Sequence, residues 1–318
     1  MDARQEWTSE ANHKFDDELW LLGQPPLHDY LRYAEDMTIQ GAGAERADLV
    51  DEWRAANDRY YDLAESEPGI ADTVEIRDLP VELGPLAAEV RADGRYRRAF
   101  DSLPTRFAIV ELDKLVVSQQ HVNLTHADRL KSRLGLAPSR ETLFRFCLPL
   151  ERPQALVQSR RMGSRRFLFW SESSDLRFQE AARLNPEQVC DYDAFGPMAG
   201  VIGLAVGYGS NFLNLIQSDN RLLLHNGHHR AYALRDMGIT HAPCIIQTVT
   251  RTDELNLVAS QDVCEMPAFY FKAPRPPVLK DFFDPKLRKV FRTPRIVRAV
   301  EVSFEVREFE TRDFGTLG

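Results

Sequence analysis

The chain has 318 residues, of which 43% are hydrophobic and 28% are charged, a composition typical of a globular protein with one large or two modest domains. Its four cysteines are scattered without a CxxC pair, which argues against a disulfide scaffold and a zinc ribbon. No run approaches the roughly 18 apolar residues of a membrane span, and the first residues lack a basic and apolar signal segment. We therefore expect a cytoplasmic protein with no membrane contact.

The N-terminal part of the chain is strongly acidic. Residues 1–80 carry 20 acidic and 7 basic residues, whereas the rest of the chain carries 28 acidic and 33 basic residues. We expect residues 1–100 to form an acidic helical region, because apolar residues within 16–66 recur at helical spacing and favour helices over 27–37 and 44–66. This region either docks a basic partner or caps the main domain with solvated acidic side chains.

Short strand-like runs alternate with helices in the middle of the chain, which predicts a mixed α/β core over residues 104–262. A helix is expected with Thr125 as its N-cap. The expected strands of the first half lie at 107–112, at 115–117 as its continuation, at 143–149, and as a hairpin at 155–171. Residues from about 137 to 219 are expected to form an insertion into the core.

The second half of the core has the clearest pattern. We expect a hairpin turn at 218–220 and a strand at 221–225. A helix at 228–237 and a strand at 243–249 should follow. A strand, a helix and a strand in this order predict a βαβ unit. Residues 263–318 are expected to form a basic, proline-rich strap that ends in an edge strand.

The strongest local signal is the segment Asn226–Arg230, which follows a buried strand and opens a helix. Gly227 makes the tight turn, and the free N–H groups of the first helical turn form an anion site with the positive end of the helix dipole. His228, His229 and Arg230 add donors, since a guanidinium offers a planar fork for phosphate oxygens. Cations at a helix N-terminus oppose the dipole, a conflict that a bound anion would resolve. The alternative is a polar turn with ordinary capped ends.

This segment, together with its helix and the strand at Ala242–Val249, resembles the nucleotide-binding box of the ParB/sulfiredoxin superfamily, in which a Gly-x-His-Arg or Gly-Glu-Arg-Arg segment holds the nucleotide phosphates. Val110–Leu130 resembles the opening strand, loop and helix of the family, and Thr250–Ser260 resembles the helix that closes a sulfiredoxin domain. The matches cover about 104–136 and 220–262. The resemblance implies a ParB/sulfiredoxin-like mixed-sheet core.

The resemblance implies that Gly227, His229 and Arg230 contact phosphates, with Asn226 beside them. His228 occupies the position of the reactive sulfiredoxin cysteine, so thiol-based reduction of a sulfinic acid is not expected. Chromosome-partitioning ParB proteins carry a glutamate and an arginine where this chain has His228 and His229, and no helix-turn-helix pattern follows. Small-molecule kinases of this fold, including free-serine kinases, have a box of the Gly-x-His-Arg type.

We therefore expect a nucleotide-binding protein that transfers or hydrolyses a terminal phosphate. The expected cofactor is ATP, ADP or CTP, with Mg²⁺ as a possible companion and an unidentified small molecule as the acceptor. Phosphoryl transfer needs a group that takes the acceptor's proton or anchors the divalent ion, and Glu111, Asp113 and His228 are the catalytic candidates. No metal ligands are assigned, because His225 in a strand and His229 in a helix need not converge.

The apolar run Gly200–Gly209 is punctuated by glycines. Because these glycines interrupt the run instead of leading it into a helix, we expect a tightly packed strand and not a dinucleotide-binding loop. The alternative is a loop whose N–H groups complete the ligand pocket together with Ser210 and Asn211.

Four arginines lie beside aromatic residues on the expected hairpin: Arg160, Arg161, Arg165 and Arg166. This pattern suits single-stranded nucleic acid, and it is equally typical of a strand with one packed and one solvated face. A second hypothesis is therefore a non-catalytic module in which nucleotide occupancy switches a surface for nucleic acid or protein. A ParB-like nuclease ranks lower, because no acidic cluster has the spacing that two-metal cleavage requires.

Overall fold

The computed structural model describes residues 15–24, 26–39, 44–150, 157–173, 175–189, 195–295 and 297–310. The chain divides into two units: the first comprises Met1–Arg152 and Ser210–Arg295, and the second comprises Pro153–Gly209 and Ile296–Gly318. Most of the segment expected as an insertion over 137–219 therefore belongs to the second unit. The acidic N-terminal region belongs to the same unit as the core.

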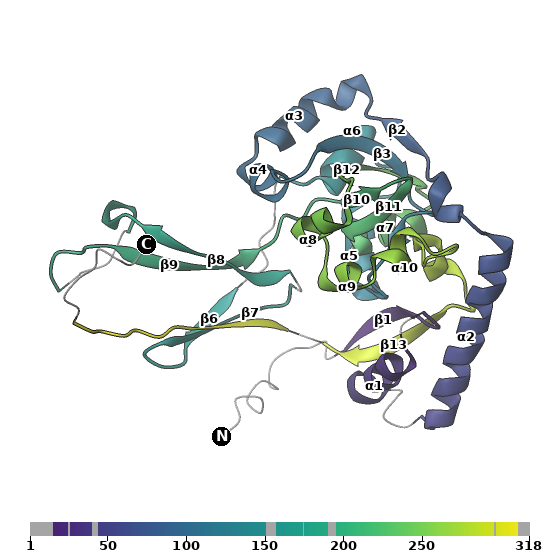
Figure 1. Ribbon diagram of the computed structural model, residues 1–318, viewed down its shortest axis with the longest axis horizontal. Coiled ribbons are helices and arrows are strands. Elements are labelled where there is room, and N and C mark those ends of the chain that lie inside the picture. Colours follow the sequence, from purple (N-terminus) through teal and green to yellow (C-terminus); the bar gives the residue numbers. More distant parts are fainter. Residues whose placement is uncertain are drawn as a thin grey trace. The chain divides into compact units, whose positions relative to one another are not determined.

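A six-stranded mixed sheet is the main sheet of the first unit (Figure 1). Its strands are β2 (Ile76–Asp78), β3 (Thr105–Glu111), β4 (Val116–Val117), β10 (Asn214–Ser218), β11 (Arg221–Asn226) and β12 (His241–Val249). They follow the order β2-β3-β12-β10-β11-β4, with β10 parallel to β12, β11 parallel to β4, and the other neighbours antiparallel. The expected mixed α/β class is confirmed.

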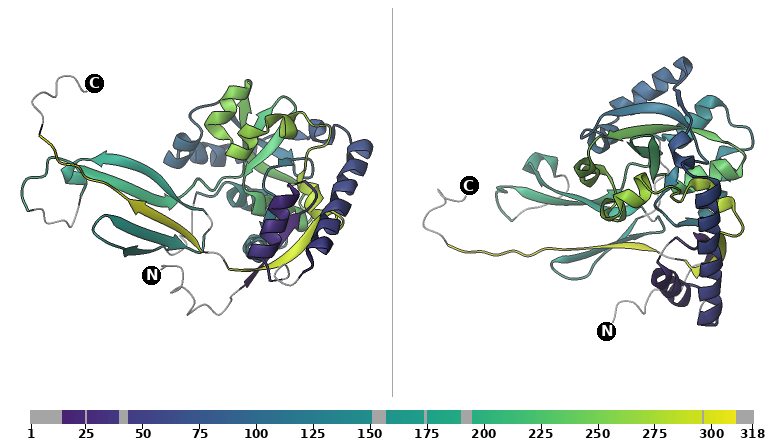
Figure 2. Two further views of the ribbon diagram at one scale, coloured as in Figure 1. Left: turned by 60° about the horizontal axis from the view of Figure 1, so that its bottom comes forward. Right: turned by 45° about the vertical axis from the view of Figure 1, so that its right-hand side comes forward.

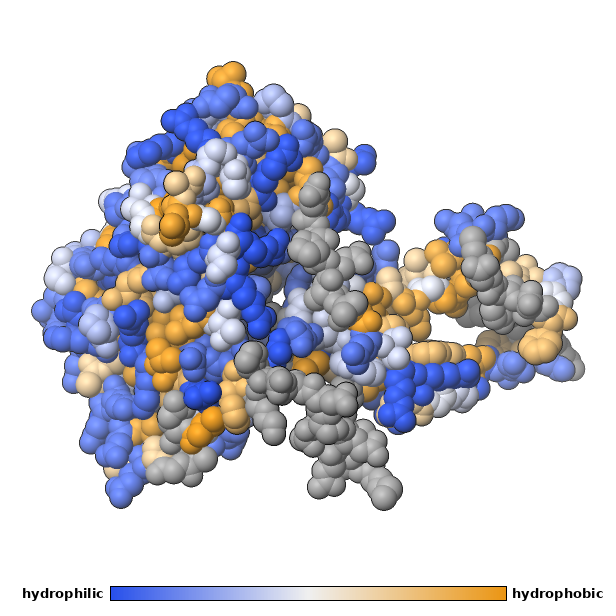
Figure 3. Space-filling model, turned by 180° about the vertical axis from the view of Figure 1, so that it is seen from behind, coloured by the Kyte–Doolittle hydropathy of each residue, from blue (hydrophilic) through white to orange (hydrophobic). Residues whose placement is uncertain are grey.

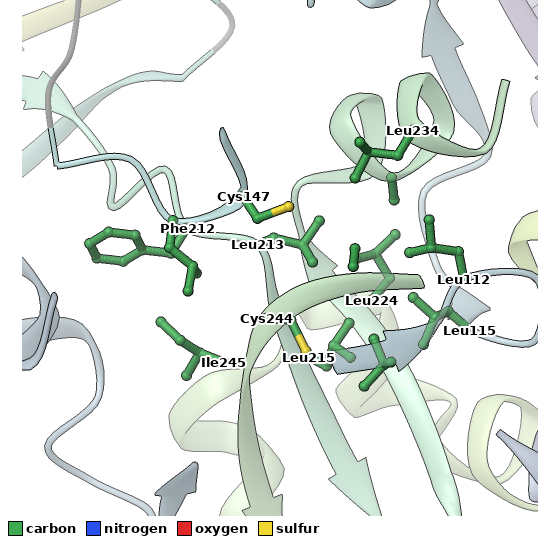
Figure 4. Close-up of a cluster of buried hydrophobic side chains, with 14 of the residues drawn as sticks. Leu112, Leu115, Cys147, Phe212, Leu213, Leu215, Leu224, Leu234, Cys244 and Ile245 are labelled. Atoms are coloured by element: carbon green, nitrogen blue, oxygen red, sulfur yellow. The ribbon is translucent and has the colours of Figure 1, made fainter. Parts of the chain in front are cut away.

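Side chains of β11 alternate between two hydrophobic cores, so the sheet is buried on both faces. Leu224 lies in one core with Leu213 and Leu234 (Figure 4), whereas Leu223 lies in the other core with Ile216. The first core includes side chains of α5 (Leu124–Leu134), α6 (Arg140–Cys147) and α7 (His228–Asp236), and the second includes side chains of α8 (Leu255–Val258), α9 (Gln261–Glu265) and α10 (Pro267–Phe271).

The strands β11 and β12 and the helix α7 occur as expected, but they do not form a βαβ unit. β10 lies between β11 and β12, antiparallel to the first and parallel to the second. The two strands that α7 joins therefore run in opposite directions. The order of elements in the sequence does not reveal this direction, because the parallel partner of β12 is an upstream strand.

The strand expected over 143–149 is wrong, because residues up to Cys147 continue α6. Ser139 caps this helix: its hydroxyl oxygen accepts a hydrogen bond from the amide of Thr142 at 3.1 Å. The apolar residues of this segment lie on one helical face, and Phe144 and Cys147 are buried.

Two further local expectations are wrong. Val116–Val117 does not continue β3, because it forms β4 at the opposite edge of the sheet. The N-cap of α5 is Asn123 and not Thr125, since the Asn123 side chain accepts a hydrogen bond from the amide of His126 at 2.7 Å. α5 thus begins immediately after the strand β5 (His121–Asn123), and its first turn lies beside that strand.

A three-stranded antiparallel sheet joins distant parts of the first unit. β1 (Phe15–Leu21) lies between β13 (Arg288–Pro294) and β5 (His121–Asn123). β1 corrects the helical expectation for the beginning of 16–66. Its side chains alternate in exposure before the buried Leu19, as a half-buried strand requires.

The helices expected over 27–37 and 44–66 are confirmed as α1 (Leu27–Met37) and α2 (Arg46–Ser66). They form a hydrophobic core of their own with β13 (Figure 2), in which Tyr30, Leu49 and Phe291 are buried. Two shorter helices, α3 (Gly84–Ala92) and α4 (Gly94–Ala99), precede β3.

The proline-rich segment after α10 is fixed by a buried ion pair. The side chain of Arg275 is 0% exposed and donates to the carboxylate of Asp281 at 2.6 and 2.8 Å and to Glu67 at 3.2 Å. Lys280 adds a bond to Glu67 at 2.7 Å. Because Glu67 directly follows α2, these bonds tie the segment to that helix.

The second unit contains two small antiparallel sheets: β14 (Arg298–Ser303), β7 (Arg166–Ser171) and β6 (Gln158–Arg161) form one, and β8 (Leu176–Leu184) and β9 (Val201–Tyr208) form the other. The expected hairpin is confirmed as β6 and β7, and the glycine-rich run is a strand, β9. Among its described residues, Leu176 and Val302 are the buried hydrophobic side chains. Hydrophobic and charged side chains both reach its surface (Figure 3).

None of the helices within the described ranges combines the length and apolar character that a bilayer crossing requires.

Candidate functional site

The turn between β11 and α7 requires glycine. Gly227 has a φ of +95°, and a Cβ at this position would lie 3.0 Å from Cδ1 and 3.2 Å from Cα of Leu213. Its carbonyl accepts the amides of Arg230 at 3.0 Å and Ala231 at 2.8 Å. The amides of residues 228 and 229 precede these bonds, and amides at this position have no acceptor within a helix.

The structure brings together four residues that were expected to contact the nucleotide: Ser210, Asn211, Asn226 and Arg230. Arg230 forms hydrogen bonds with Asn211, and Asn226 forms one with Ser210. Arg230 is 6% exposed, and its guanidinium donates to the carbonyl oxygens of Cys147 at 3.2 Å and Asn211 at 2.9 Å and to Oδ1 of Asn211 at 2.6 Å. Asn226 donates through Nδ2 to the carbonyl of Ser210 at 3.0 Å. The fork expected to bind phosphate therefore fixes the loop before β10 against α7.

His228 opens α7 with a buried imidazole that is 7% exposed. Its Nε2 is buried and has no hydrogen-bond partner. Burial, followed by the nearby His225 and His121, lowers the pKa of His228 to about 3, so the ring is neutral at pH 7. Buried polar atoms without a partner are rare in folded proteins. Among the described residues, the hydroxyl of Tyr60 and Nε2 of Gln247 share this property with His228.

Two further histidines, from α5 and β5, extend this cluster. The ring of His126 meets the ring of His229 edge-on, with 5.1 Å between centroids, and the ring of His121 stacks on Trp20 at 5.2 Å. Burial and the neighbouring rings lower the pKa of His229 to about 3. Burial also lowers the pKa of His126 and of His121. The cluster is thus a set of neutral imidazoles around the first turn of α7.

β1 supplies the carboxylates whose charges act on this cluster. Glu18 favours the protonated form of His121, and Asp16 favours the protonated form of His126. The carboxylate of Glu18 also accepts a hydrogen bond from the hydroxyl of Tyr33 at 2.7 Å. Neither residue lies in a motif. Asp16 and Glu18 lie at alternate positions of β1, so their side chains share one partly exposed face of the strand. The pairing of β1 with β5 is what brings this face near the histidines.

The carboxylates expected to act on the phosphate lie at the other end of α7. Asp113 pairs with Arg235 in the last turn of the helix. Glu111 pairs with Lys114 at 3.1 Å and accepts the amide of Glu75 at 3.2 Å. A helix of nine residues is about 13 Å long, so neither carboxylate is brought to the first turn of α7.

The histidine cluster does not have the arrangement of a metal site: the part of the chain that the structure describes contains no group of three or more His, Cys, Asp or Glu that could hold a metal ion. A cavity of about 10 Å³ lies at the end of β4, lined in part by Val117–Gln120, Tyr270 and Pro277. Its volume suits one water molecule. Asn226, Gly227 and His229 are partly exposed.

The four arginines of the hairpin lie in the second unit. Arg166 forms two hydrogen bonds of 3.0 Å with Glu301, and Arg161 donates to its own turn at 2.9 Å. Arg160 and Arg165 are exposed and have no carboxylate partner among the described residues. The structure therefore leaves two of the four guanidinium groups open to a polyanion.

No family model matches this chain, and no curated protein or solved structure is significantly similar to it.

Proposed function

We propose that this chain is a nucleotide-binding protein of the ParB/sulfiredoxin-like fold and that the first turn of α7 binds the nucleotide phosphates. The observation that carries the proposal is the buried, unpartnered Nε2 of His228 in the first turn of α7. Helix N-termini of this kind bind phosphate through their amides and dipole. The turn at Gly227 and the packing of α5 on α7 agree with the segments that carry the family resemblance.

The roles of the residues differ from those in the sequence-based expectation. In this proposal the amides of His228 and His229 hold phosphate oxygens, and the partly exposed His229 ring contacts the phosphate. Arg230 has a positioning role, because its guanidinium is bonded to Cys147 and Asn211 and fixes the loop against α7. Its removal would disturb the shape of the site before it changed the charge at the phosphate.

The activity that we propose is transfer or hydrolysis of the terminal phosphate, which needs a group that takes a proton from the acceptor hydroxyl or water. A neutral imidazole of the cluster is the candidate base, because Glu111 and Asp113 lie at the far end of α7. The same two carboxylates do not fit a magnesium site that serves this turn, since Lys114 and Arg235 already neutralise them. The proposed chemistry therefore uses the imidazoles and amides of this chain.

A thermal-shift screen tests the proposal. A ligand that binds the native state at 100 times its Kd stabilises it by about 2.7 kcal/mol, which raises Tm by several degrees. We expect ATP, ADP, CTP or pyrophosphate to raise Tm and adenosine alone to leave it unchanged. If no phosphate compound raises Tm, the proposal is wrong.

Turnover is tested with a nucleotide labelled in its terminal phosphate. We expect label to be released or transferred by the wild type, and this activity to be lost in His229→Ala at unchanged Tm. His241→Ala is the matched control, because His241 bonds to Glu75 at 3.1 Å beside the far end of α7. Binding without any turnover would leave a nucleotide-binding module without catalytic activity.

Such a module is the second candidate, and the open guanidinium groups of Arg160 and Arg165 favour it. It predicts binding of single-stranded nucleic acid that weakens steeply with salt and is lost in the double variant Arg160→Ala/Arg165→Ala. The variant Arg166→Ala is the control, because that side chain is already paired with Glu301. Equal binding by all these variants would exclude the hairpin as the interface.

A further inference from the structure

β9 is an edge strand without the charged side chains that usually protect such strands from other chains. Within the described ranges it pairs with β8 and with no other strand (Figure 1). The free edge of a strand offers its N–H and C=O groups to another chain. We propose that this edge of β9 pairs antiparallel with β9 of a second copy of this chain, so that the protein is a two-fold symmetric dimer. The inference does not depend on the proposed function.

The two strands of this β8–β9 ribbon differ in charge. β8 carries Arg177, Glu180 and Arg183, whereas residues 195–218, which include all of β9, contain no charged residue. Charged side chains on an edge strand discourage pairing with another chain. The ribbon therefore has one protected strand and one strand that is open to pairing.

The glycine-bearing face of β9 is already covered from within the ribbon. A Cβ at Gly203 would lie 2.9 Å from Cδ1 of Leu184, and a Cβ at Gly207 would lie 3.0 Å from Nε2 of Gln179. Nε2 of Gln179 also donates to the carbonyl of Tyr208 at 2.8 Å. The glycines of β9 are therefore explained by side chains of β8, and this face needs no partner.

The opposite face of β9 is apolar and largely uncovered. Because side chains alternate along a strand, Ile202, Leu204 and Val206 share this face. Ile202 is 76% exposed, and Phe178, which lies opposite Val206 on β8, is 45% exposed. Leu176 is the buried hydrophobic residue of the ribbon among its described residues. The ribbon thus exposes apolar side chains next to a free strand edge.

A second copy would complete the ribbon. A two-stranded sheet is marginally stable by itself, whereas three or more strands with a hydrophobic face are stable. The ribbon is anchored at one end, where Nε of Arg298 donates to the carbonyl of Leu176 at 3.3 Å and the hydroxyls of Ser171 and Tyr208 lie 3.0 Å apart. Pairing of two β9 strands would give a four-stranded sheet in the order β8-β9-β9-β8, which is a usual size for a sheet.

Symmetry and charge favour a second copy over other occupants of this edge. A two-fold axis perpendicular to the sheet would place Ile202, Leu204 and Val206 of both copies on the same side. Two uncharged strands bring no like charges together, and the charged β8 strands at the outer edges would stop the assembly at two copies. A nucleic acid would instead require cations, which β9 does not carry.

Two measurements on the full-length protein test this inference. Sedimentation velocity from low to high micromolar concentration should show a monomer that converts to a dimer. Hydrogen exchange of the β9 amides should slow over the same range, because pairing provides acceptors for the N–H groups of the free edge. The exchange measurement uses the wild type alone, so it decides the matter even if a variant fails to fold.

Three variants of the ribbon identify the interface. Ile202→Lys should weaken dimerisation about tenfold, because the two-fold axis brings the added charge into the shared sheet twice. Ile202→Thr, which keeps a β-branched side chain without a charge, should dimerise nearly as the wild type does. Phe178→Lys is the matched control, because it adds the same charge to an exposed position of β8, and it should weaken dimerisation less than Ile202→Lys.

The contrary outcomes are distinct. A monomer at every concentration would overturn the inference, and so would a dimer whose β9 amides exchange as fast as those of the monomer. Assemblies larger than a dimer would contradict the closed two-fold pairing. Protection of β9 that requires added single-stranded DNA would assign the edge to nucleic acid and overturn pairing between copies.

Discussion

The two ends of α7 differ in how their basic side chains are charged and paired. At the C-terminal end, Arg235 is paired with Asp113, and Lys131 bridges Asp128 at 2.7 Å and Asp236 at 2.5 Å. At the N-terminal end, the imidazoles are neutral, and no carboxylate pairs with His228 or His229 among the described residues. Charged side chains at the C-terminal end are thus neutralised by partners, whereas the N-terminal end carries uncharged imidazoles.

The neutral state of these histidines also removes most of the conflict between basic side chains and the helix dipole. Histidines at the start of α7 do not oppose the dipole while they are uncharged. Arg230 is charged, but carbonyl oxygens of Cys147 and Asn211 surround its guanidinium. Arg235, by contrast, lies where the dipole favours a cation. The sequence alone suggests an electrostatic cost at the N-terminal end, and the structure removes most of it.

The largest expected effect is that of Arg230→Met. The substitution removes three hydrogen bonds of a charged donor, one buried and two part-buried, so we expect the free energy of unfolding to fall by about 3–5 kcal/mol. Arg235→Met at the other end of α7 is the matched control, and urea denaturation measures both. Equal losses for the two variants would contradict the contrast between the two ends.

Gly227→Ala should rank next. The alanine must adopt a left-handed φ and place its Cβ against Leu213, for which we expect a loss of about 2–4 kcal/mol. Gly238→Ala isolates the backbone contribution, because Gly238 has a φ of +80° with open space around its Cβ position, and it should cost about 1 kcal/mol. Thermal denaturation of both variants gives the difference between their losses of stability. A smaller loss for Gly227→Ala than for Gly238→Ala would show that the turn at Gly227 is not closely packed against Leu213.

Acid should destabilise the free protein through the same histidines. The unfolded chain binds protons near pH 6.5, whereas the pKa of His228 and of His229 in the folded protein is about 3, so folded-state stability is lost as pH falls below 6.5. We expect a loss of about 2 kcal/mol from the buried His228 between pH 7 and pH 5 and a smaller loss from the partly exposed His229. The measurement is denaturation over this range for the wild type and His228→Asn, whose stability should depend less on pH. Parallel pH profiles would show that His228 is not held neutral.

The smallest expected effect belongs to the ion pair at the C-terminal end. Asp113 and Arg235 are partly solvated, so a double-mutant cycle of Asp113→Asn and Arg235→Gln should give a coupling of about 0.2–1 kcal/mol. Neither single variant should change the binding of pyrophosphate. A strong effect on binding would place this pair in the site after all.

Local patterns predicted the elements around the site well. The buried run before Gly227, the turn, α7 and β12 follow from apolar burial and glycine placement, and these do not depend on distant residues. The contacts of the site were harder to predict. Asp16 and Glu18 reach the cluster only because β1 pairs with β5 about 100 residues later, and no spacing in the sequence encodes that pairing. The role of Arg230 depends on the carbonyl of Cys147, which no side-chain motif can reveal.

The misassigned segment at 143–149 shows a second limit. Its apolar residues suit a strand or a buried helical face equally well over so short a run. The helix is favoured by the cap at Ser139 and by the pair of Glu141 with Arg145 one turn later, at 3.1 Å. Polar contacts of this kind therefore distinguish a helix from a strand where the hydrophobic pattern fits both.

The position of β1 has a consequence for biosynthesis. A ribosome releases residues 15–21 first, yet both neighbours of this strand come later, and β13 ends at Pro294. The three-stranded sheet can therefore close only after residues 288–294 have been translated. Until then the acidic strand that acts on His121 and His126 lacks its outer partner, so the surroundings of these histidines are completed late in folding.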